Sequence, residues 1–305
     1  MTAAYEGHSD IVQKLLDYDV DPDVVKNRGR SALFFAAQGG YMKALQAILS
    51  SGRANINLTD KNQLSPLHLA SLGRSNEVVA FLIGKGANID AVDDSGNAPL
   101  SFACRIGNVD IVRTFLQAGA AVDLPDDTLW TPLHLVLQEV KPETHEIVKL
   151  LLEYGANVNV RTDGGSMPPH IAAQEGDFDI LRDLIAKGAD INAEMSKGTP
   201  LMRAVVNGHV DAVEFLCENG ANTSFSKTLG TSALHLALAR NPNYDIVHKL
   251  IKMGADVNAM DNNDDTPLAL AVSEDNLELV ELLLDDGAEH GNVELYITGI
   301  VEWEC

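Results

Sequence analysis

Histidine and cysteine are the side chains through which this chain could bind a metal ion or supply a nucleophile or base. The chain has nine histidines and three cysteines. No histidine lies in an H-E-x-x-H motif, and no group of histidines and cysteines has the spacing of a zinc site. Cys104, Cys217 and Cys305 lie far apart in the sequence. We therefore predict no bound metal ion and no cysteine nucleophile.

The 24 glycines form no nucleotide-binding motif. The chain has no G-x-x-x-x-G-K-[ST] loop, no G-x-G-x-x-G that opens a helix after a strand, and no G-x-S-x-G turn. Carboxylate pairs are frequent in so acidic a chain, so a single pair is weak support for acid–base catalysis. These residues predict a protein that has no catalytic activity and needs no cofactor.

The charge of the chain excludes several classes of partner. Its 305 residues include 44 Asp and Glu against 22 Lys and Arg, which gives a formal net charge of −22. Such a charge repels nucleic-acid backbones and anionic membrane surfaces. No apolar stretch is long enough for a membrane span, and no signal peptide is visible. Together with the scattered, odd-numbered cysteines, this predicts an intracellular monomer, cytoplasmic or alternatively nuclear, that binds no nucleic acid and does not insert into membranes.

A recurring tetrapeptide shows which elements must position the polar side chains. Between residue 32 and residue 267, the second positions of successive copies lie 34, 33, 33, 36, 32, 33 and 34 residues apart. A Gly-Ala pair recurs independently at 86, 119, 155, 188, 220, 254 and 287. The clear copies of the tetrapeptide are Ser65-Pro66-Leu67-His68, Ala98-Pro99-Leu100-Ser101, Thr131-Pro132-Leu133-His134, Thr199-Pro200-Leu201-Met202, Ser232-Ala233-Leu234-His235 and Thr266-Pro267-Leu268-Ala269.

These motifs resemble the ankyrin repeat, whose signature includes T-P-L-H-x-A at a period of about 33 residues. The resemblance implies an all-α solenoid in which helix-turn-helix units stack and turns project from them. We expect an array over residues 1–290 with about nine units, the first of them incomplete. Residues 291–305 carry no repeat marker and form either a cap or a truncated element. The resemblance also implies that His68 and its equivalents tie neighbouring turns together.

The physical chemistry of the motifs agrees with this interpretation. Ser or Thr is a good helix N-cap, and Pro fits the next position because its missing N–H is not needed there. The run Ile147–Leu152 provides the apolar stripe of a second, stacked helix. The step of 36 residues indicates three extra residues, Val140-Lys141-Pro142, between the two helices of one repeat.

The resemblance implies that a partner protein binds on the concave face, which combines the turn tips with the ends of the first helices. Trp130 replaces a polar turn residue, and Trp and Arg dominate binding hot spots. The alternative for Trp130 is packing against the next turn. We expect the centre of the groove at Arg105, Ile106, Trp130, Gln138 and Glu139, with Gln174 and Glu175 as further binding residues.

The two ends of the chain differ in charge. Residues 253–305 contain fourteen carboxylates and no Lys or Arg. We expect a partner to present basic segments to this C-terminal half. The alternative is that the carboxylates only keep the stack soluble.

Two further functions remain open from the sequence. The chain could be the targeting or sensing arm of a larger enzyme, channel or signalling ATPase, because ankyrin arrays serve as such arms. It could also be a substrate, because the segments ending in Asn258 and Asn192 resemble those that asparaginyl hydroxylases modify in ankyrin turns.

Overall fold

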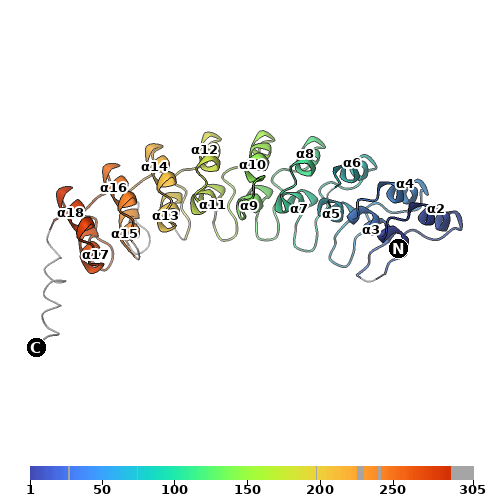
Figure 1. Cartoon of the computed structure of the whole chain (residues 1–305), viewed down its shortest axis with the longest axis horizontal. Helices are drawn as coiled ribbons and strands as arrows, with labels where there is room; N and C mark the ends of the chain where they lie inside the picture. Colours follow the sequence, from blue (N-terminus) through green and yellow to red (C-terminus); the bar gives the residue numbers. More distant parts are fainter. Residues whose placement is uncertain (27, 74, 197, 225–229, 240–241, 290–305) are drawn as a thin grey trace, which may run out of the picture. The chain divides into compact units, whose positions relative to one another are not determined.

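Each clear tetrapeptide begins a short helix in the computed structural model, which describes residues 1–26, 28–73, 75–196, 198–224, 230–239 and 242–289. Over these residues the chain has eighteen helices and no β-strand, so the predicted all-α fold is confirmed. Consecutive helices pair, the first helix of each repeat lying beside its second (Figure 1). The predicted segment 291–305 lies outside the described residues.

The chain divides into two compact units, the first covering Met1–Asp163 and the second beginning at Gly164. The helices of the first unit are α1 (Thr2–Tyr5), α2 (Ser9–Asp17), α3 (Ala32–Gln38), α4 (Met42–Ser50), α5 (Pro66–Ser71), α6 (Asn76–Gly84), α7 (Pro99–Ile106), α8 (Val109–Gln117), α9 (Pro132–Leu137) and α10 (Thr144–Glu153). The helices of the second unit are α11 (Pro168–Glu175), α12 (Phe178–Ala186), α13 (Pro200–Val206), α14 (Val210–Glu218), α15 (Ala233–Leu238), α16 (Tyr244–Lys252), α17 (Pro267–Ser273) and α18 (Leu277–Asp285).

Capping residues set the helix starts. Ser65 caps α5, where its side chain accepts a hydrogen bond from the backbone N–H of His68 and Pro66 takes the first helical position. Asn108 caps α8 in the same way, its side-chain oxygen accepting from Ile111 N–H at 3.1 Å. At the other end of the second helices a glycine adopts positive φ, as at Gly155 (φ +85°), because a left-handed residue costs least there.

Stacked helices supply the core within each unit. In the first unit α5 packs on α7 and α7 packs on α9, while α6, α8 and α10 form a second row. Small and aliphatic side chains fill most of these contacts, together with the fully buried aromatic rings of Phe34 and Phe115. No single helix pair could bury its own apolar face, so the stacking provides the hydrophobic stabilisation. No helix among the described residues is long and apolar enough to cross a membrane.

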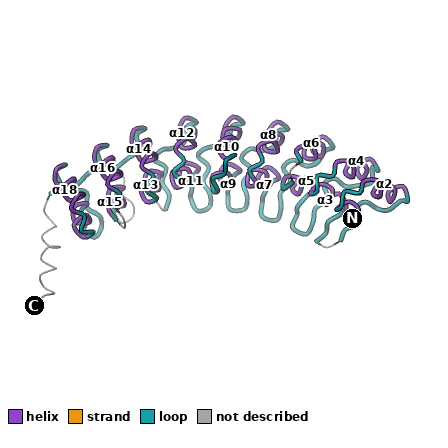
Figure 2. The backbone as a smooth tube through the Cα atoms, viewed as in Figure 1, coloured by secondary structure: helices purple, strands orange, loops and turns teal. Residues whose placement is uncertain are grey.

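Turns connect each second helix to the next first helix, and they extend beyond the first helices (Figure 2). Within a turn an aspartate holds the backbone; Asp60 Oδ1, for example, accepts from the N–H groups of Asn62 and Leu64. Neighbouring turns of the first unit are joined by backbone hydrogen bonds. These bonds run from Lys61 N–H to Arg28 O (2.8 Å), Asp94 N–H to Asn62 O (3.0 Å), Asp127 N–H to Ser95 O (3.0 Å) and Asp163 N–H to Thr128 O (3.1 Å).

Candidate protein-binding face

Buried histidines tie first helices to the repeat that follows them. Nδ1 of His68 accepts a hydrogen bond from Ser65 N–H at 3.0 Å, so Nε2 carries the proton and donates to Asn97 O at 3.0 Å. Burial lowers the pKa of His68 and keeps the ring neutral. His170 and His235 likewise reach carbonyl oxygens of the following repeat, at 3.0 and 3.1 Å. The predicted role of these side chains in joining repeats is confirmed.

A second tie between repeats uses an asparagine side-chain amide in the segment that follows a second helix. The Nδ2 group of Asn258 donates to Gly287 O at 3.2 Å, and its Oδ1 accepts from Glu289 N–H at 2.7 Å. Asn57 and Asn192 make the same pair of bonds to the next repeat. The two predicted hydroxylation positions, Asn192 and Asn258, therefore each have both ends of the amide hydrogen-bonded.

The first unit holds five of the predicted binding residues. Arg105 and Ile106 end α7, and Gln138 and Glu139 directly follow α9, which packs against α7. Trp130 lies in the turn just before the capping residue of α9. The predicted placement of these residues at first-helix ends and in a turn thus agrees with the structure, while their role in binding stays a prediction.

The side chains of these residues differ in their exposure and in the contacts that hold them. Arg105 points back to its own turn, where Nη2 donates to Asn97 Oδ1 at 3.2 Å. The aliphatic side chain of Ile106 makes no hydrogen bond and is 49% exposed. Trp130 is half-buried, with its ring 5.8 Å from the ring of His134, so it packs partly on its own repeat. No hydrogen bond or ring contact joins Trp130 to Arg105 within the described residues.

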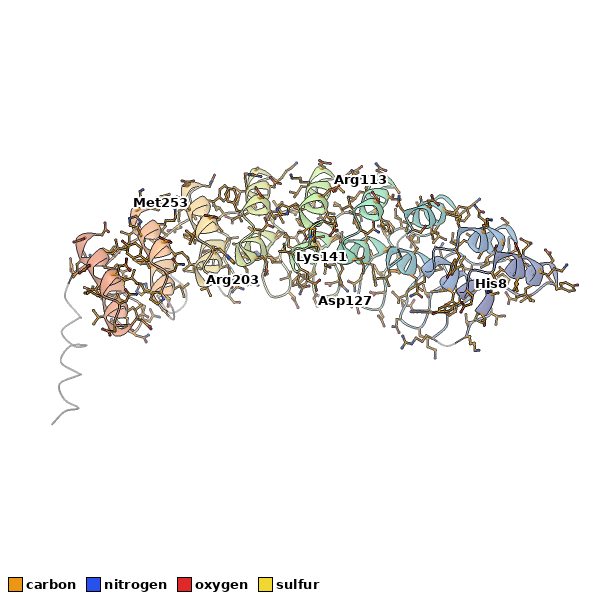
Figure 3. All side chains as sticks on the ribbon, in the orientation of Figure 1. His8, Arg113, Asp127, Lys141, Arg203 and Met253 are labelled. Carbon is orange, nitrogen blue, oxygen red and sulfur yellow. The ribbon has the colours of Figure 1, made fainter. Side chains whose placement is uncertain are left out.

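Lys141 contacts two of the predicted binding residues, although the binding prediction did not include it. It lies in the three-residue insertion, and Nζ donates to Arg105 O at 2.5 Å and pairs with Glu139 Oε2 at 3.1 Å. Figure 3 places it between Arg113 of the second helices and Asp127 at a turn tip. The signal that could have found it was the insertion itself, because the longer turn brings a basic side chain within reach of the preceding repeat.

In the second unit Gln174 and Glu175 end α11. The side-chain oxygen of Gln174 accepts from Arg203 Nη2, and its backbone carbonyl accepts from His209 Nε2 at 2.8 Å. The Gln174 Nε2 group donates to Glu175 at 3.1 Å. Gln174 is therefore held by its own unit, and Arg203, a charged residue inside a first helix, was not predicted to hold it.

Neither described cysteine has the setting of a nucleophile. Burial raises the pKa of the Cys104 thiol. Burial and the nearby charge of Glu218 raise the pKa of Cys217 to about 11. Both thiols therefore stay protonated at neutral pH. Among the described residues no group of three His, Cys, Asp or Glu side chains could hold a metal ion; Cys305 lies outside them.

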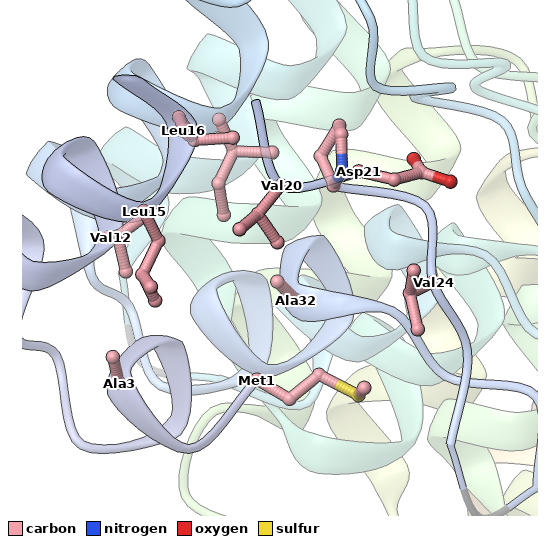
Figure 4. A pocket seen from close by; sticks show the side chains of 11 residues that line it. Met1, Ala3, Val12, Leu15, Leu16, Val20, Asp21, Val24 and Ala32 are labelled. Carbon is pink, nitrogen blue, oxygen red and sulfur yellow. The ribbon is translucent and has the colours of Figure 1, made fainter. Parts of the chain in front are cut away.

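An apolar pocket of about 150 Å³ lies at the N-terminal end of the first unit (Figure 4). Val12, Leu15 and Leu16 of α2 line one side, and Val20 and Val24 of the following segment line another. Asp21 is the only charged residue among the described lining residues. The pocket therefore offers hydrophobic contact and no set of polar groups that could orient a substrate.

Comparison with known proteins agrees with this geometry. The family model for ankyrin repeats (three copies) matches residues 1–93, 73–162, 140–227, 169–261 and 222–293. The chain is 31% identical over 327 residues to the ankyrin repeat and KH domain-containing protein mask-1 of Caenorhabditis elegans, covering 94% of this chain and 11% of that protein. It is 26% identical over 304 residues to the human transient receptor potential cation channel subfamily A member 1, covering 94% of this chain and 27% of the channel.

A third relative is the mouse B-cell lymphoma 3 protein homolog, 32% identical over 146 residues, which are 47% of this chain and 32% of that protein. The chain spans about a third or less of the length of each of these three relatives. The matches to the family model cover nearly the whole sequence and coincide with the helix pairs and turns described above. The chain belongs to the ankyrin-repeat family.

Proposed function

We propose that this chain is a scaffold or adaptor that binds a partner protein through the turn tips and first-helix ends, without catalysis of its own. Ankyrin repeats generally mediate protein–protein interaction. The contact residues in the first unit are Arg105, Ile106, Trp130, Gln138 and Glu139. In the second unit we propose Glu175 and Gln174 as further contact residues, the side chain of Gln174 being hydrogen-bonded to those of Arg203 and Glu175.

The joined turns of the first unit carry this proposal. Backbone hydrogen bonds tie each turn tip to the next, as from Asp127 N–H to Ser95 O. Side chains on these turns, such as the 47% exposed Leu129 beside Trp130, are therefore presented on a backbone that is already ordered. A preorganised surface loses less conformational entropy when a partner binds, which favours affinity.

The charge of the second unit favours a partner with basic segments. Eleven of the fourteen carboxylates after residue 252 belong to described residues, and no Lys or Arg accompanies them. Helix α18 and the segments on either side of it hold most of these groups. An acidic surface speeds the approach of a basic partner and discriminates against acidic ones.

A crosslinking pull-down from the native cell, followed by a binding measurement with the purified partner, tests the proposal. Trp130→Ala should raise the dissociation constant at least about tenfold, as expected for a hot-spot aromatic residue. Tyr154→Ala is the matched control, because Tyr154 is an aromatic residue outside the proposed surface, exposed at the end of a second helix. Equal affinity of wild type and Trp130→Ala would show that the partner binds elsewhere.

A second candidate function is that of a targeting or sensing arm in a larger enzyme, channel or signalling ATPase. The coverage of the relatives favours it, since 94% of this chain corresponds to 27% of a cation channel and to 11% of a KH domain-containing protein. Immunoblotting of the native cell distinguishes the two cases. A protein of 32.8 kDa would contradict the proposal that the chain is an arm of a larger protein, and a much larger protein would support it.

Asparaginyl hydroxylation at Asn258 or Asn192 is a third proposal, supported by the resemblance of their segments to hydroxylated ankyrin turns. Peptide mass spectrometry of protein from the native cell tests it. The expected result is one added oxygen atom on either residue, and unmodified peptides from both would end the proposal. We further propose that the chain acts inside the cell, in the cytoplasm or the nucleus, as a monomer.

A further inference from the structure

A groove of about 660 Å³ crosses three repeats of the first unit. It lies between the C-terminal ends of α5 and α7 and the N-terminal ends of α8 and α10. Three aliphatic side chains line it: Leu72 (38% exposed), Ile106 (49% exposed) and the half-buried Val109. Because exposed aliphatic surface gains free energy when it leaves water, these side chains favour contact with an apolar group.

The three-residue insertion builds one wall of this groove. Six residues, 138–143, separate α9 from α10, whereas only Gly107 and Asn108 separate α7 from α8. The inserted turn is held by hydrogen bonds from Lys141 N–H to Thr144 Oγ1 (2.9 Å) and from Thr144 N–H to Lys141 O (3.0 Å). The bond from Lys141 Nζ to Arg105 O fixes it to the neighbouring repeat. The turn thereby holds the backbone of Glu143 in a fixed place at the groove.

Carboxylates surround the aliphatic side chains. Asp110, Glu143 and Glu146 line the groove, and Arg113 pairs with Glu146 at 2.9 Å. Within the described part of the chain, no cation pairs with Asp110 or Glu143; Arg74 lies outside that part. Two negative charges that have no cation partner among the described residues therefore lie at the edge of an apolar surface.

The geometry points to one kind of occupant, a linear segment of a partner protein that presents an aliphatic side chain flanked by Lys or Arg. The aliphatic side chain contacts Leu72 and Ile106, and the basic side chains approach Asp110 and Glu143. An acidic segment would be repelled by the same carboxylates. This inference rests on the proposed function and adds the site and the chemistry of the partner.

A titration of the full chain, labelled with ¹³C at its Ile and Leu methyl groups, tests this inference. The probe is the peptide acetyl-Lys-Leu-Lys-Leu-Lys-amide, and its counterpart has Glu in place of each Lys. We expect saturable shifts of the Leu72 and Ile106 methyl signals with the basic peptide alone. Glu143→Gln and Asp110→Asn should each raise the dissociation constant about threefold, the usual effect of one exposed charge.

The matched control is Asp94→Asn, which removes an exposed carboxylate from a turn tip of the same unit. Its dissociation constant should equal that of wild type, because Asp94 lies outside the groove. An equal loss in Asp94→Asn would mean that the peptide responds only to net charge, and the inference would fail. Shifts confined to methyl groups away from Leu72 and Ile106 would also overturn it.

Affinity measurements with the native partner distinguish a failure of this inference from a failure of the proposed function. If Trp130→Ala weakens the partner while the double variant Asp110→Asn, Glu143→Gln leaves its affinity unchanged, the groove assignment is wrong and the proposed function stands. If both variants weaken the partner, both statements are supported. If neither variant weakens it, the partner binds elsewhere, and both the groove assignment and the proposed contact surface are wrong. Circular dichroism must first show that each variant unfolds at a temperature close to that of wild type.

Discussion

The ammonium group of Lys141 donates a hydrogen bond to the backbone carbonyl of Arg105, 36 residues earlier in the chain. The same group pairs with Glu139, so one side chain joins the inserted turn both to itself and to the preceding repeat. The turn of six residues is thus a fixed part of the first unit. The length of the turn does not by itself make the turn flexible.

Removal of this ammonium should loosen the turn. Lys141→Met keeps the aliphatic stem and removes both polar contacts, and we expect it to lower the free energy of unfolding by about 1 kcal/mol. Urea denaturation measures the loss, and hydrogen exchange of the amides in 138–143 should become faster. Lys149→Met, on the exposed side of α10, serves as the control and should leave both quantities unchanged. A wild-type exchange rate in Lys141→Met would contradict the role given to Lys141.

Neutral His68 makes the stability of the first unit depend on pH. Burial places its pKa below the ordinary value of 6.5, so the unfolded chain binds more protons than the folded chain as pH falls below 6.5. The free energy of unfolding should therefore decrease between pH 7 and pH 5. His68→Gln should weaken this dependence, because glutamine does not titrate, and should cost about 2 kcal/mol at pH 7 through its poorer hydrogen bonds. An unchanged pH dependence in His68→Gln would argue against a neutral His68.

Asp123 occupies the position that Asn57, Asn192 and Asn258 occupy in other repeats. It accepts a hydrogen bond from Asn157 N–H at 3.1 Å but has no amide hydrogen to donate to the next repeat. Desolvation by burial raises its pKa, against the opposing effect of the bond from Asn157, so its ionised form costs stability as pH rises above 3.8. Asp123→Asn should raise the free energy of unfolding by about 0.5–1 kcal/mol at pH 7.

The gain in Asp123→Asn should vanish near pH 3, where the wild-type carboxyl is protonated. Thermal unfolding at the two pH values measures this difference. The control is Asp127→Asn at an exposed turn tip, which should not raise stability at either pH. A gain of equal size in both variants would indicate a general effect of net charge instead of a local one.

Arg30 compensates Asp60, the only buried Asp or Glu among the described residues. Its Nε lies 2.9 Å from Asp60 Oδ2, and the side chain of Asp60 is only 1% exposed. Arg30→Met leaves this charge without its cation, and we expect a loss of about 2–3 kcal/mol in the free energy of unfolding. The double variant Arg30→Met, Asp60→Asn should recover part of the loss. No recovery would show that Arg30 acts through packing.

The repeat framework could be predicted from the sequence because its cause is local. Thr131, Pro132 and His134 act through capping and proline geometry within one turn of helix, and their recurrence reveals the period. The position of the insertion followed from counting, since any extra residues between two regular helices must form a longer turn.

The hydrogen bonds and the exposure of individual site residues could not be predicted in the same way. Whether Gln174 is free or held depends on Arg203 and His209, which lie about thirty residues further along the chain. Likewise the sequence did not show that Arg105 turns back to Asn97 while Ile106 stays exposed. Such differences arise from side-chain packing between repeats, on which the period gives no information.

The amide tie between repeats has a consequence for the chemical ageing of the protein. Slow deamidation of Asn57, Asn192 or Asn258 would replace an amide donor by a carboxylate and place a negative charge near a glycine carbonyl. Each such event would create the kind of joint that Asp123 already forms, and the repeats on its two sides would separate more easily. The three asparagines therefore make the cohesion of the stack depend on how long a molecule has existed as well as on its sequence.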